Sequence, residues 1–303
     1  MPIPYFDAHC DTVSACARKG RSLRKNSGHL DLERLSAFES PGQIFALWAD
    51  GGDMAECRRQ HALFSRELRD SADLALPCPR GEDIAGARRA GRIAALLSVE
   101  GGELLDCDPE LLSEAASWGV RSVNLTWNHR NALSGSHCDD PDRGLTDRGR
   151  AFVREAERLG IFLDVSHLSD RGFWDLAAMA SRPLLATHSD ARSVCPHSRN
   201  LTDDMFRAVC ESGGVAGLNL YVPFVGGEEL DAIARHLEHF LDLGGERHLC
   251  LGLDLDGCDR LAGGIHGLQD LPRLWNGLLD RGFGRELLTD LFSRSLARLL
   301  GGI

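Results

Sequence analysis

Nowhere does the sequence contain about 18 consecutive apolar residues, the length that a helix needs to cross a bilayer. Its first residues lack the basic start and the long apolar run of a secretion signal, and its last residues carry no lipid-anchor tail. We therefore expect a protein that neither spans a membrane nor is anchored to one.

Paired cysteines are also missing, because none of the ten cysteines belongs to a Cys-x-x-Cys motif. Cysteines scattered over 303 residues favour free thiols over a disulfide framework, which is typical of small secreted domains. We therefore expect a reducing compartment and a cytoplasmic protein. The formal net charge of −11 argues against nucleic acid or an anionic membrane surface as a partner.

Short apolar runs recur along the chain, most of them separated by helical segments. They cover residues 3–6, 42–50, 93–100, 120–126, 161–167, 183–189, 214–221 and 248–257. This alternation is typical of parallel strands joined by helical crossovers, and eight such strands close a (β/α)8 barrel of the TIM type. A doubly wound open sheet is the alternative, but no Gly-x-Gly-x-x-Gly motif follows the first run. Without a repeat or a linker, residues 1–303 are expected to form one domain.

Polar residues mark the places where helices are expected to begin. Thr146, Ser169 and Thr202 each precede a helical segment and are predicted to cap it. Residues 12–35 are polar and basic and contain glycine, so they are predicted to form a loop that could cover a site.

The residues best suited to chemistry gather at the ends of the predicted strands. They are His9, Asp11, Glu100, Asn128, His167, His188, Tyr221, Asp254 and Asp256. In a barrel these strand ends meet at one mouth, where active sites lie. Imidazoles and carboxylates together suit divalent transition metals, and this set is large enough for two ions with Glu100 between them. Taken singly, each residue could instead be a hydrogen-bonded loop residue, a cap or a turn former, but a buried cluster of unpaired carboxylates would be costly without a cation.

Longer motifs surround these residues. They are Asp7-Ala8-His9-Cys10-Asp11, Ser98-Val99-Glu100-Gly101-Gly102, Asn124-Leu125-Thr126, Asp164-Val165-Ser166-His167, Thr187-His188-Ser189-Asp190-Ala191-Arg192-Ser193-Val194-Cys195, Ser198-Arg199-Asn200-Leu201-Thr202-Asp203-Asp204, Asn219-Leu220-Tyr221 and Asp254-Leu255-Asp256-Gly257. With these motifs, in this order and over nearly the whole chain, the sequence resembles the membrane dipeptidase (renal dipeptidase) family of zinc peptidases, which are amidohydrolase-like barrels. The resemblance is to the soluble, bacterial-type members of that family.

The resemblance implies a set of metal ligands. His9 and Asp11 would bind one zinc ion, His167 and His188 would bind a second, and Glu100 would bridge the two ions. A hydroxide shared by the two ions would attack the carbonyl group of a dipeptide.

The resemblance also implies roles toward the substrate. Asp254 would act on the nucleophilic water and carry the proton to the leaving amine, and Asp256 would support it or form the loop. Arg199 would hold the substrate's C-terminal carboxylate by a two-pronged contact, and Tyr221 is a candidate for the substrate pocket. The family also suggests tolerance of a C-terminal D-residue and a homodimer.

One position departs from the family. Trp127 stands where the animal members carry a histidine that polarises the scissile carbonyl, so His129 or Asn128 would have to make this substrate contact. The departure keeps a second interpretation open, in which the same metals serve hydrolysis of N-acyl-amino acids or lactones. A metal-binding barrel without activity is a more remote alternative.

Overall fold

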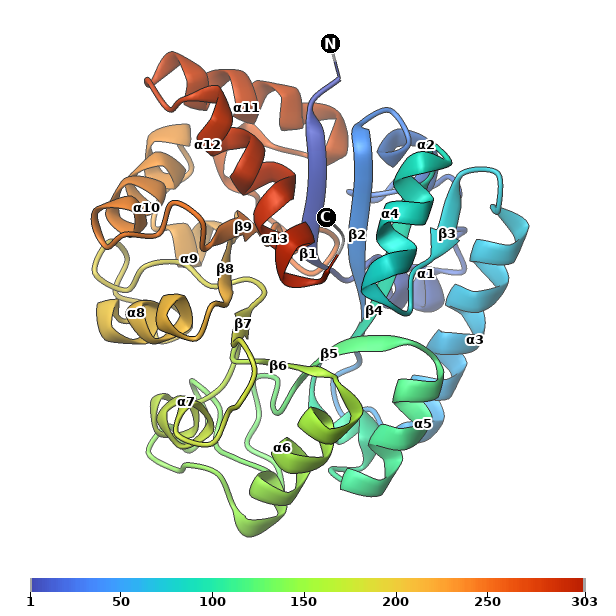
Figure 1. Cartoon of the computed structure of the whole chain (residues 1–303), viewed down its shortest axis with the longest axis vertical. Helices are drawn as coiled ribbons and strands as arrows, with labels where there is room; N and C mark the ends of the chain where they lie inside the picture. The colour runs from blue at the N-terminus through green and yellow to red at the C-terminus, as the bar shows by residue number, and fades with distance from the viewer. Residues whose placement is uncertain (1, 302–303) are drawn as a thin grey trace.

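Parallel pairing between neighbouring strands closes a ring in the computed structural model, which describes residues 2–301 (Figure 1). The ring runs in the order β2, β1, β9, β8, β7, β6, β5 and β4, and pairing of β4 with β2 closes it. The strands are β1 (Pro4–Cys10), β2 (Glu39–Leu47), β4 (Ile93–Val99), β5 (Val120–Asn124), β6 (Phe162–Asp164), β7 (Leu185–Ala186), β8 (Val215–Leu218) and β9 (Leu249–Leu251). The predicted (β/α)8 barrel is confirmed, and each of its strands lies within or beside a predicted apolar run.

A ninth strand, β3 (Ala75–Pro77), was not predicted. It pairs with the start of β4, at Ile93. From Leu97 onwards, β5 pairs with the same edge of β4. β3 therefore lies outside the ring of eight. Three residues are too few to show an alternating pattern, and a proline is tolerated only because β3 is an edge strand.

Helices cover the outside of the ring (Figure 1). They are α1 (Thr12–Lys19), α2 (Leu32–Leu35), α3 (Met54–Asp70), α4 (Gly81–Arg89), α5 (Leu112–Ser117), α6 (Asp147–Leu159), α7 (Asp170–Ala177), α8 (Asp203–Glu211), α9 (Val222–Val225), α10 (Leu230–Asp242), α11 (Leu271–Asp280), α12 (Arg285–Thr289) and α13 (Ser295–Leu299). The three predicted caps are confirmed, because the side chains of Thr146, Ser169 and Thr202 each accept a hydrogen bond from the backbone N–H three residues later.

The loop predicted for residues 12–35 is wrong, because α1 and α2 lie within it. α1 begins directly after Asp11 and buries Val13 and Cys16 against the core, while its basic last turn faces solvent. Gly20, in the left-handed conformation at φ 61°, ends it. The many polar residues concealed a short helix that has only one apolar face.

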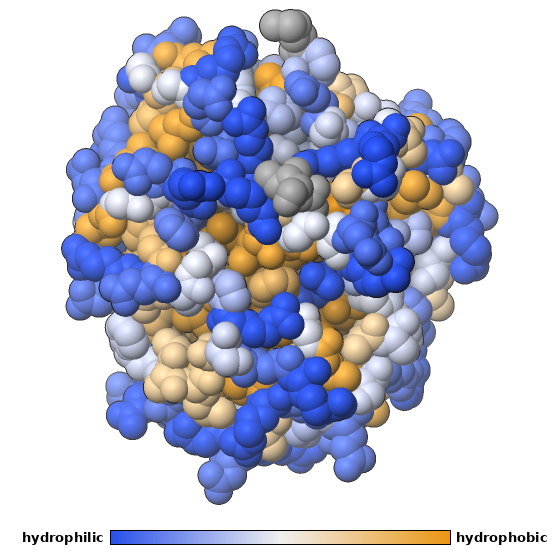
Figure 2. Space-filling view, viewed as in Figure 1, coloured by the Kyte–Doolittle hydropathy of each residue, from blue (hydrophilic) through white to orange (hydrophobic). Residues whose placement is uncertain are grey.

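Inside the ring, one cluster of apolar side chains comes from seven of its strands and from α4 and α13. Ala94 and Leu96 of β4 belong to this inner cluster, whereas Ala95 and Leu97 belong to the outer cluster beneath the helices. Because side chains alternate along a strand, Glu100 after β4 points inward. α13 lies in front of the strands in Figure 1 and closes the end of the barrel opposite the site. Hydrophobic residues show towards the centre of this face, and hydrophilic residues cover much of its rim (Figure 2).

The first strand, β1, pairs with β9, the last strand of the ring in sequence order. Asp7 pairs with Leu251, and the Leu253 backbone N–H donates to Asp7 Oδ1 at 2.9 Å. A parallel bridge between Cys10 and Leu255 continues this contact towards the mouth. The polar residues that follow β1 and β9 therefore lie close together at the barrel mouth.

Candidate metal centre

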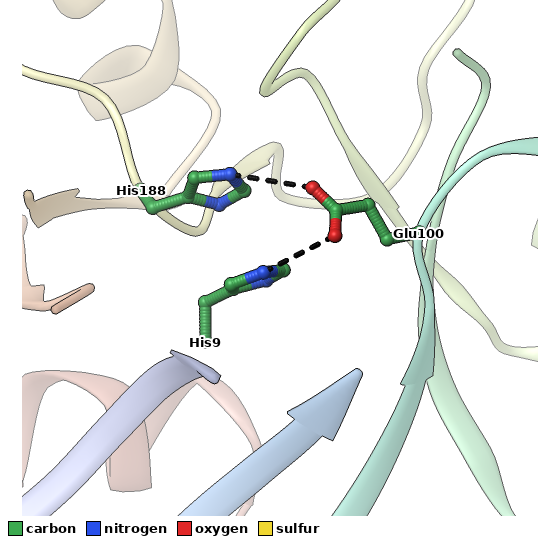
Figure 3. Close-up of side chains that lie close together, drawn as sticks. All are labelled: His9, Glu100 and His188. Atoms are coloured by element: carbon green, nitrogen blue, oxygen red, sulfur yellow. Dashed lines mark ion pairs between the residues drawn. The ribbon is translucent and has the colours of Figure 1, made fainter. Parts of the chain in front are cut away.

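Glu100 lies between histidines that come from three different strands of the barrel. Its Oε2 is 3.4 Å from His9 Nε2, and its Oε1 is 2.9 Å from His167 Nε2 and 3.5 Å from His188 Nε2. Figure 3 shows His9 and His188 on the two oxygens of this carboxylate. All four side chains are buried. The two oxygens of one buried carboxylate thus face histidines from opposite sides.

The lone pair on Nε2 of His167 points towards Glu100. Its Nδ1 lies 2.9 Å from Asn128 Oδ1, which can only accept a hydrogen bond. The proton of the neutral ring is therefore on Nδ1, and Nε2 is left as an acceptor that faces a carboxylate oxygen.

The ring of His188 is arranged in the same way. The Thr187 hydroxyl gives its only proton to Asp164, so it must accept from His188 Nδ1, 2.7 Å away. The Nε2 atoms of His188 and His167 lie 3.0 Å apart, and both face Glu100 Oε1. Three acceptors directed at one point repel one another unless a cation lies between them, so these residues fit a metal ion.

A second group of possible ligands adjoins the first. One ligand atom each of His9, Asp11 and Asp254 lies within 4.8 Å of the others, and the same holds for His9, Glu100 and His188. Among residues 2–301, neither ring nitrogen of His9 has a hydrogen-bond partner. A Cβ at Gly257 would collide with the carboxylate oxygens of both Asp11 and Asp254, so the glycine leaves room for this cluster. The mouth therefore holds two adjoining groups of possible metal ligands that share His9.

The carboxylates of the cluster favour a positive charge at its centre. Burial by itself lowers the pKa of His9, but the Glu100 carboxylate, with Asp11 and Asp254, outweighs it and raises this pKa to about 10. Burial lowers the pKa of His167 to about 4, with help from the charge of Arg199, and lowers that of His188 well below its usual value. Both rings are thus neutral at pH 7, as metal ligands must be, whereas His9 would have to release its proton to an ion that takes over the attraction of Glu100, Asp11 and Asp254.

Asp254 and Asp256 differ in their surroundings although both follow β9. Asp254 Oδ1 lies 4.0 Å from His9 Nε2, within the cluster. Asp256 accepts hydrogen bonds from the His29 backbone N–H at 2.8 Å and from the Thr12 hydroxyl at 2.7 Å. Asp254 therefore belongs to the cluster of possible ligands, whereas Asp256 ties the segment that contains α1 and α2 to the mouth.

Arg199 lies in the segment between β7 and α8 and is only 3% exposed. Its Nη1 donates to Ser189 Oγ at 2.7 Å, while Nε and Nη2 have no partner in the part of the chain that the structure describes. Two free N–H donors on a buried guanidinium suit a carboxylate. Tyr221 lies nearby, since its ring and the Arg199 guanidinium both pack on Phe224.

Comparison with known sequences identifies the family. A family model described as membrane dipeptidase, peptidase family M19, matches residues 1–303. The chain belongs to the membrane dipeptidase family. This confirms the resemblance found in the sequence. The family assignment makes the chain a metal-dependent dipeptidase.

Relatives of this dipeptidase come from bacteria and fungi. The chain is 33% identical over 258 residues to an uncharacterized protein from the pqqA 5′ region of Klebsiella pneumoniae, covering 81% of this chain and 95% of that protein. It is 31% identical over 220 residues to dipeptidase aclJ of Aspergillus oryzae, covering 70% of this chain and 52% of that protein.

Solved structures agree with this assignment. A metallo peptidase from Rhodobacter sphaeroides, liganded with a phosphinate mimic of the dipeptide L-Ala-D-Ala, superposes with a TM-score of 0.90 at 27% identity and 99% coverage of both chains. The dipeptidase AC, a metallo peptidase of family M19, gives 0.92 at 28% identity and full coverage of both chains. Within residues 2–301 of the present dipeptidase, no helix combines the length and apolar character needed to cross a bilayer.

The two residues predicted to replace the family's histidine lie in different surroundings. Asn128 Oδ1 accepts from His167 Nδ1 and also contacts His137 Nε2 at 3.0 Å, so this oxygen orients a histidine ring and only the amide nitrogen could donate to a substrate. The side chain of His129 is 60% exposed and pairs with Asp50 at the rim, 3.2 Å away. His129 therefore lies at the rim, and a carbonyl contact made by the amide nitrogen of Asn128 stays a prediction.

His137 is a residue of this site that the sequence did not reveal. Its backbone N–H donates to the His167 carbonyl at 2.9 Å, and its ring contacts both Asn128 and Ser198 Oγ, the latter at 2.9 Å. His137 thus joins the segment that carries Arg199 to the ligand His167. It lies in a polar loop remote from any strand end, and no pattern in the sequence marks it.

His236 of α10 braces the same segment from behind. Its Nδ1 accepts from the Ala191 N–H at 3.1 Å, and its Nε2 donates to the Val225 carbonyl at 2.9 Å. Burial lowers its pKa from 6.5 to about 4. The stabilisation that neutral His236 provides is therefore complete above pH 6.5 and is lost as the pH falls towards 4, because the unfolded chain takes up the proton first.

We expect His236→Gln, which cannot titrate, to show a shallower loss of unfolding free energy between pH 6.5 and pH 4 than the parent. The difference should reach at most about 3 kcal/mol. Urea unfolding at a series of pH values measures it. His266→Gln, at an exposed histidine, is the control and should follow the parent; equal slopes in all three proteins would contradict the role given to His236.

Proposed function

We propose that this dipeptidase binds two zinc ions and hydrolyses dipeptides at its barrel mouth. His9 and Asp11 hold one ion, His167 and His188 hold the other, and Glu100 bridges them. The observation that carries the proposal is the convergence of two histidine lone pairs on one oxygen of Glu100 while His9 faces the other oxygen. Imidazole and carboxylate donors in this combination are typical of zinc.

When bound, such a pair of ions supplies an activated water and stabilises negative charge on the carbonyl oxygen. Asp254, at the edge of the cluster, accepts the proton of the attacking water and donates it to the leaving amine. Asn128 and Thr187 keep the histidine rings in the tautomers that ligation requires.

Arg199 supplies the specificity for short peptides in this proposal. Its free Nε and Nη2 bind the C-terminal carboxylate of the substrate, so a longer peptide would place its carboxylate beyond reach. The related metallo peptidase from Rhodobacter sphaeroides holds a mimic of L-Ala-D-Ala, which supports acceptance of a C-terminal D-residue here.

Replacement of Arg199 by alanine should raise KM for dipeptides by about 10- to 100-fold, because a hydrogen bond to a charged group is lost, and should change kcat less. Steady-state kinetics on L-Ala-D-Ala and on its C-terminal amide separate the effects. The amide lacks the carboxylate, so its hydrolysis should be nearly the same in both proteins; an equal loss on the two substrates would contradict carboxylate recognition.

The function itself is tested by hydrolysis of L-Ala-L-Ala, L-Ala-D-Ala and an N-acyl-amino acid by protein whose metal content has been counted. Two zinc ions per chain and turnover of a dipeptide are expected. Turnover of the N-acyl-amino acid alone would identify N-acyl-amino acids, not dipeptides, as the substrates, since they offer Arg199 the same carboxylate. Protein that regains no activity after zinc is added would instead indicate a non-catalytic barrel.

All ten cysteines are free thiols, which supports our proposal of a reducing compartment such as the cytoplasm. The homodimer and the single domain over residues 1–303 stay predictions.

A further inference from the structure

Trp48 stands at the barrel mouth beside the bridging carboxylate. Ile44 of β2 belongs to the inner cluster, so the alternation of side chains directs Trp48, four residues later, into the barrel as well. Leu47 pairs with Val99, and the Glu100 N–H donates to the Leu47 carbonyl at 3.0 Å. Trp48 and Glu100 are therefore level with each other on adjacent strands.

The backbone of Trp48 is held in place by α3. Buried Gln60 accepts from the Trp48 N–H at 3.0 Å and donates to the Trp48 carbonyl at 2.7 Å. These two hydrogen bonds fix the position of the Trp48 backbone, from which the indole ring extends.

Trp127, at the end of β5, extends Trp48 into an aromatic wall. The two ring centres lie 4.9 Å apart at an angle of 60°, and Trp127 is 6.3 Å from the ring of His167. Both indoles are half-buried, so part of each side chain remains exposed. The wall thus reaches from Glu100 to a predicted metal ligand, at the position where animal family members carry histidine.

The aromatic wall lies across the barrel from Arg199. β2 and β7 are four strands apart in either direction around the ring of eight, so their ends face each other over the mouth. Trp48 follows β2, and Arg199 is anchored on Ser189, which follows β7. A dipeptide with its carboxylate on Arg199 and its scissile carbonyl near Glu100 therefore points its N-terminal residue at Trp48.

We propose that Trp48 and Trp127 form the subsite for the side chain of the substrate's N-terminal residue, and that the enzyme favours dipeptides with a large apolar or aromatic residue there. The inference rests on the proposed dipeptidase function and deepens it. Burial of such a side chain against two indoles should raise kcat/KM by about 10- to 100-fold over an alanine at the same position. Trp127 then serves substrate selection where a histidine serves carbonyl polarisation in the animal members.

The test compares L-Phe-D-Ala, L-Ala-D-Ala and L-Glu-D-Ala as substrates of the zinc-loaded full chain. In Trp48→Ala and Trp127→Ala, the preference for phenylalanine over alanine should fall by about tenfold or more, mainly through kcat/KM of the phenylalanine substrate. Trp48→Phe, which restores an aromatic ring, should keep most of the preference. Trp118→Ala is the matched control, because Trp118 is also half-buried and stacked on a ring, that of His61 at 4.3 Å, but precedes β5 at the other end of the barrel.

The possible outcomes distinguish a failure of the proposed subsite from a failure of the proposed dipeptidase function. An unchanged preference in both alanine variants, with all dipeptides still cleaved, would overturn the subsite and leave the dipeptidase intact. A preference for L-Glu-D-Ala would overturn it too and would indicate Arg18, whose guanidinium lies 5.1 Å from the Trp48 ring centre. No turnover of any dipeptide by protein with two zinc ions would overturn the proposed function and this inference with it. If one alanine variant does not fold, the other decides.

Discussion

Replacing Glu100 by glutamine should abolish dipeptide hydrolysis, by about a thousandfold or more, and should reduce the metal content from two ions per chain. An amide offers one neutral oxygen in place of two that share a negative charge, so it bridges two ions poorly. Its NH2 group can instead donate to the histidine lone pairs that face Oε1. The variant should therefore fold well while it fails to bind metal.

Metal counting and turnover on the same sample measure both effects. Glu103→Gln is a suitable control, because Glu103 follows the same strand but accepts a hydrogen bond from Asn131 at 2.8 Å, away from the histidine cluster. It should retain two ions. Two tightly bound ions in Glu100→Gln would refute the bridging role.

The second large effect is expected at Asp254. Asp254→Asn should lower kcat by about 10²- to 10⁴-fold, because the amide cannot take a proton from the attacking water. Asparagine suits the position, since Asp254 adopts a left-handed conformation with φ 58° that asparagine tolerates better than most residues. Loss of activity with two ions retained would assign Asp254 to proton transfer.

Asp256→Asn provides the matched comparison for this variant. Asp256 is also left-handed, at φ 66°, but its carboxylate binds His29 and Thr12. We expect a loss of stability there with kcat largely kept. If Asp254→Asn instead loses an ion, Asp254 is a ligand, in agreement with its place beside His9 and Asp11.

Sequence patterns sufficed for the barrel and for the convergence of its polar strand ends. Each metal-ligand candidate follows a recognisable apolar run, so the position of His167 or His188 depends on strand order alone. Arg199 and Asp254 needed the family's motifs as well, because no periodicity distinguishes a loop arginine, or one of two aspartates that lie two residues apart.

What the sequence could not predict depends on contacts between loops. Asn128 looks like a strand-end donor for substrate, and only the fold shows that it faces the ring of His167. His137 approaches His167 and Ser198 from a loop whose path no local rule determines. β3 and α1 were missed because one is too short and the other too polar for their periodicity to show.

The closure of the ring between β1 and β9 bears on how the site is made in the cell. The Asp7–Leu253 hydrogen bond spans 246 residues of sequence, and His9 and Asp11 leave the ribosome long before Asp254 does. The cluster of His9, Asp11 and Asp254 therefore cannot form until β9 and the residues after it have been made, and a chain stopped before β9 would lack it.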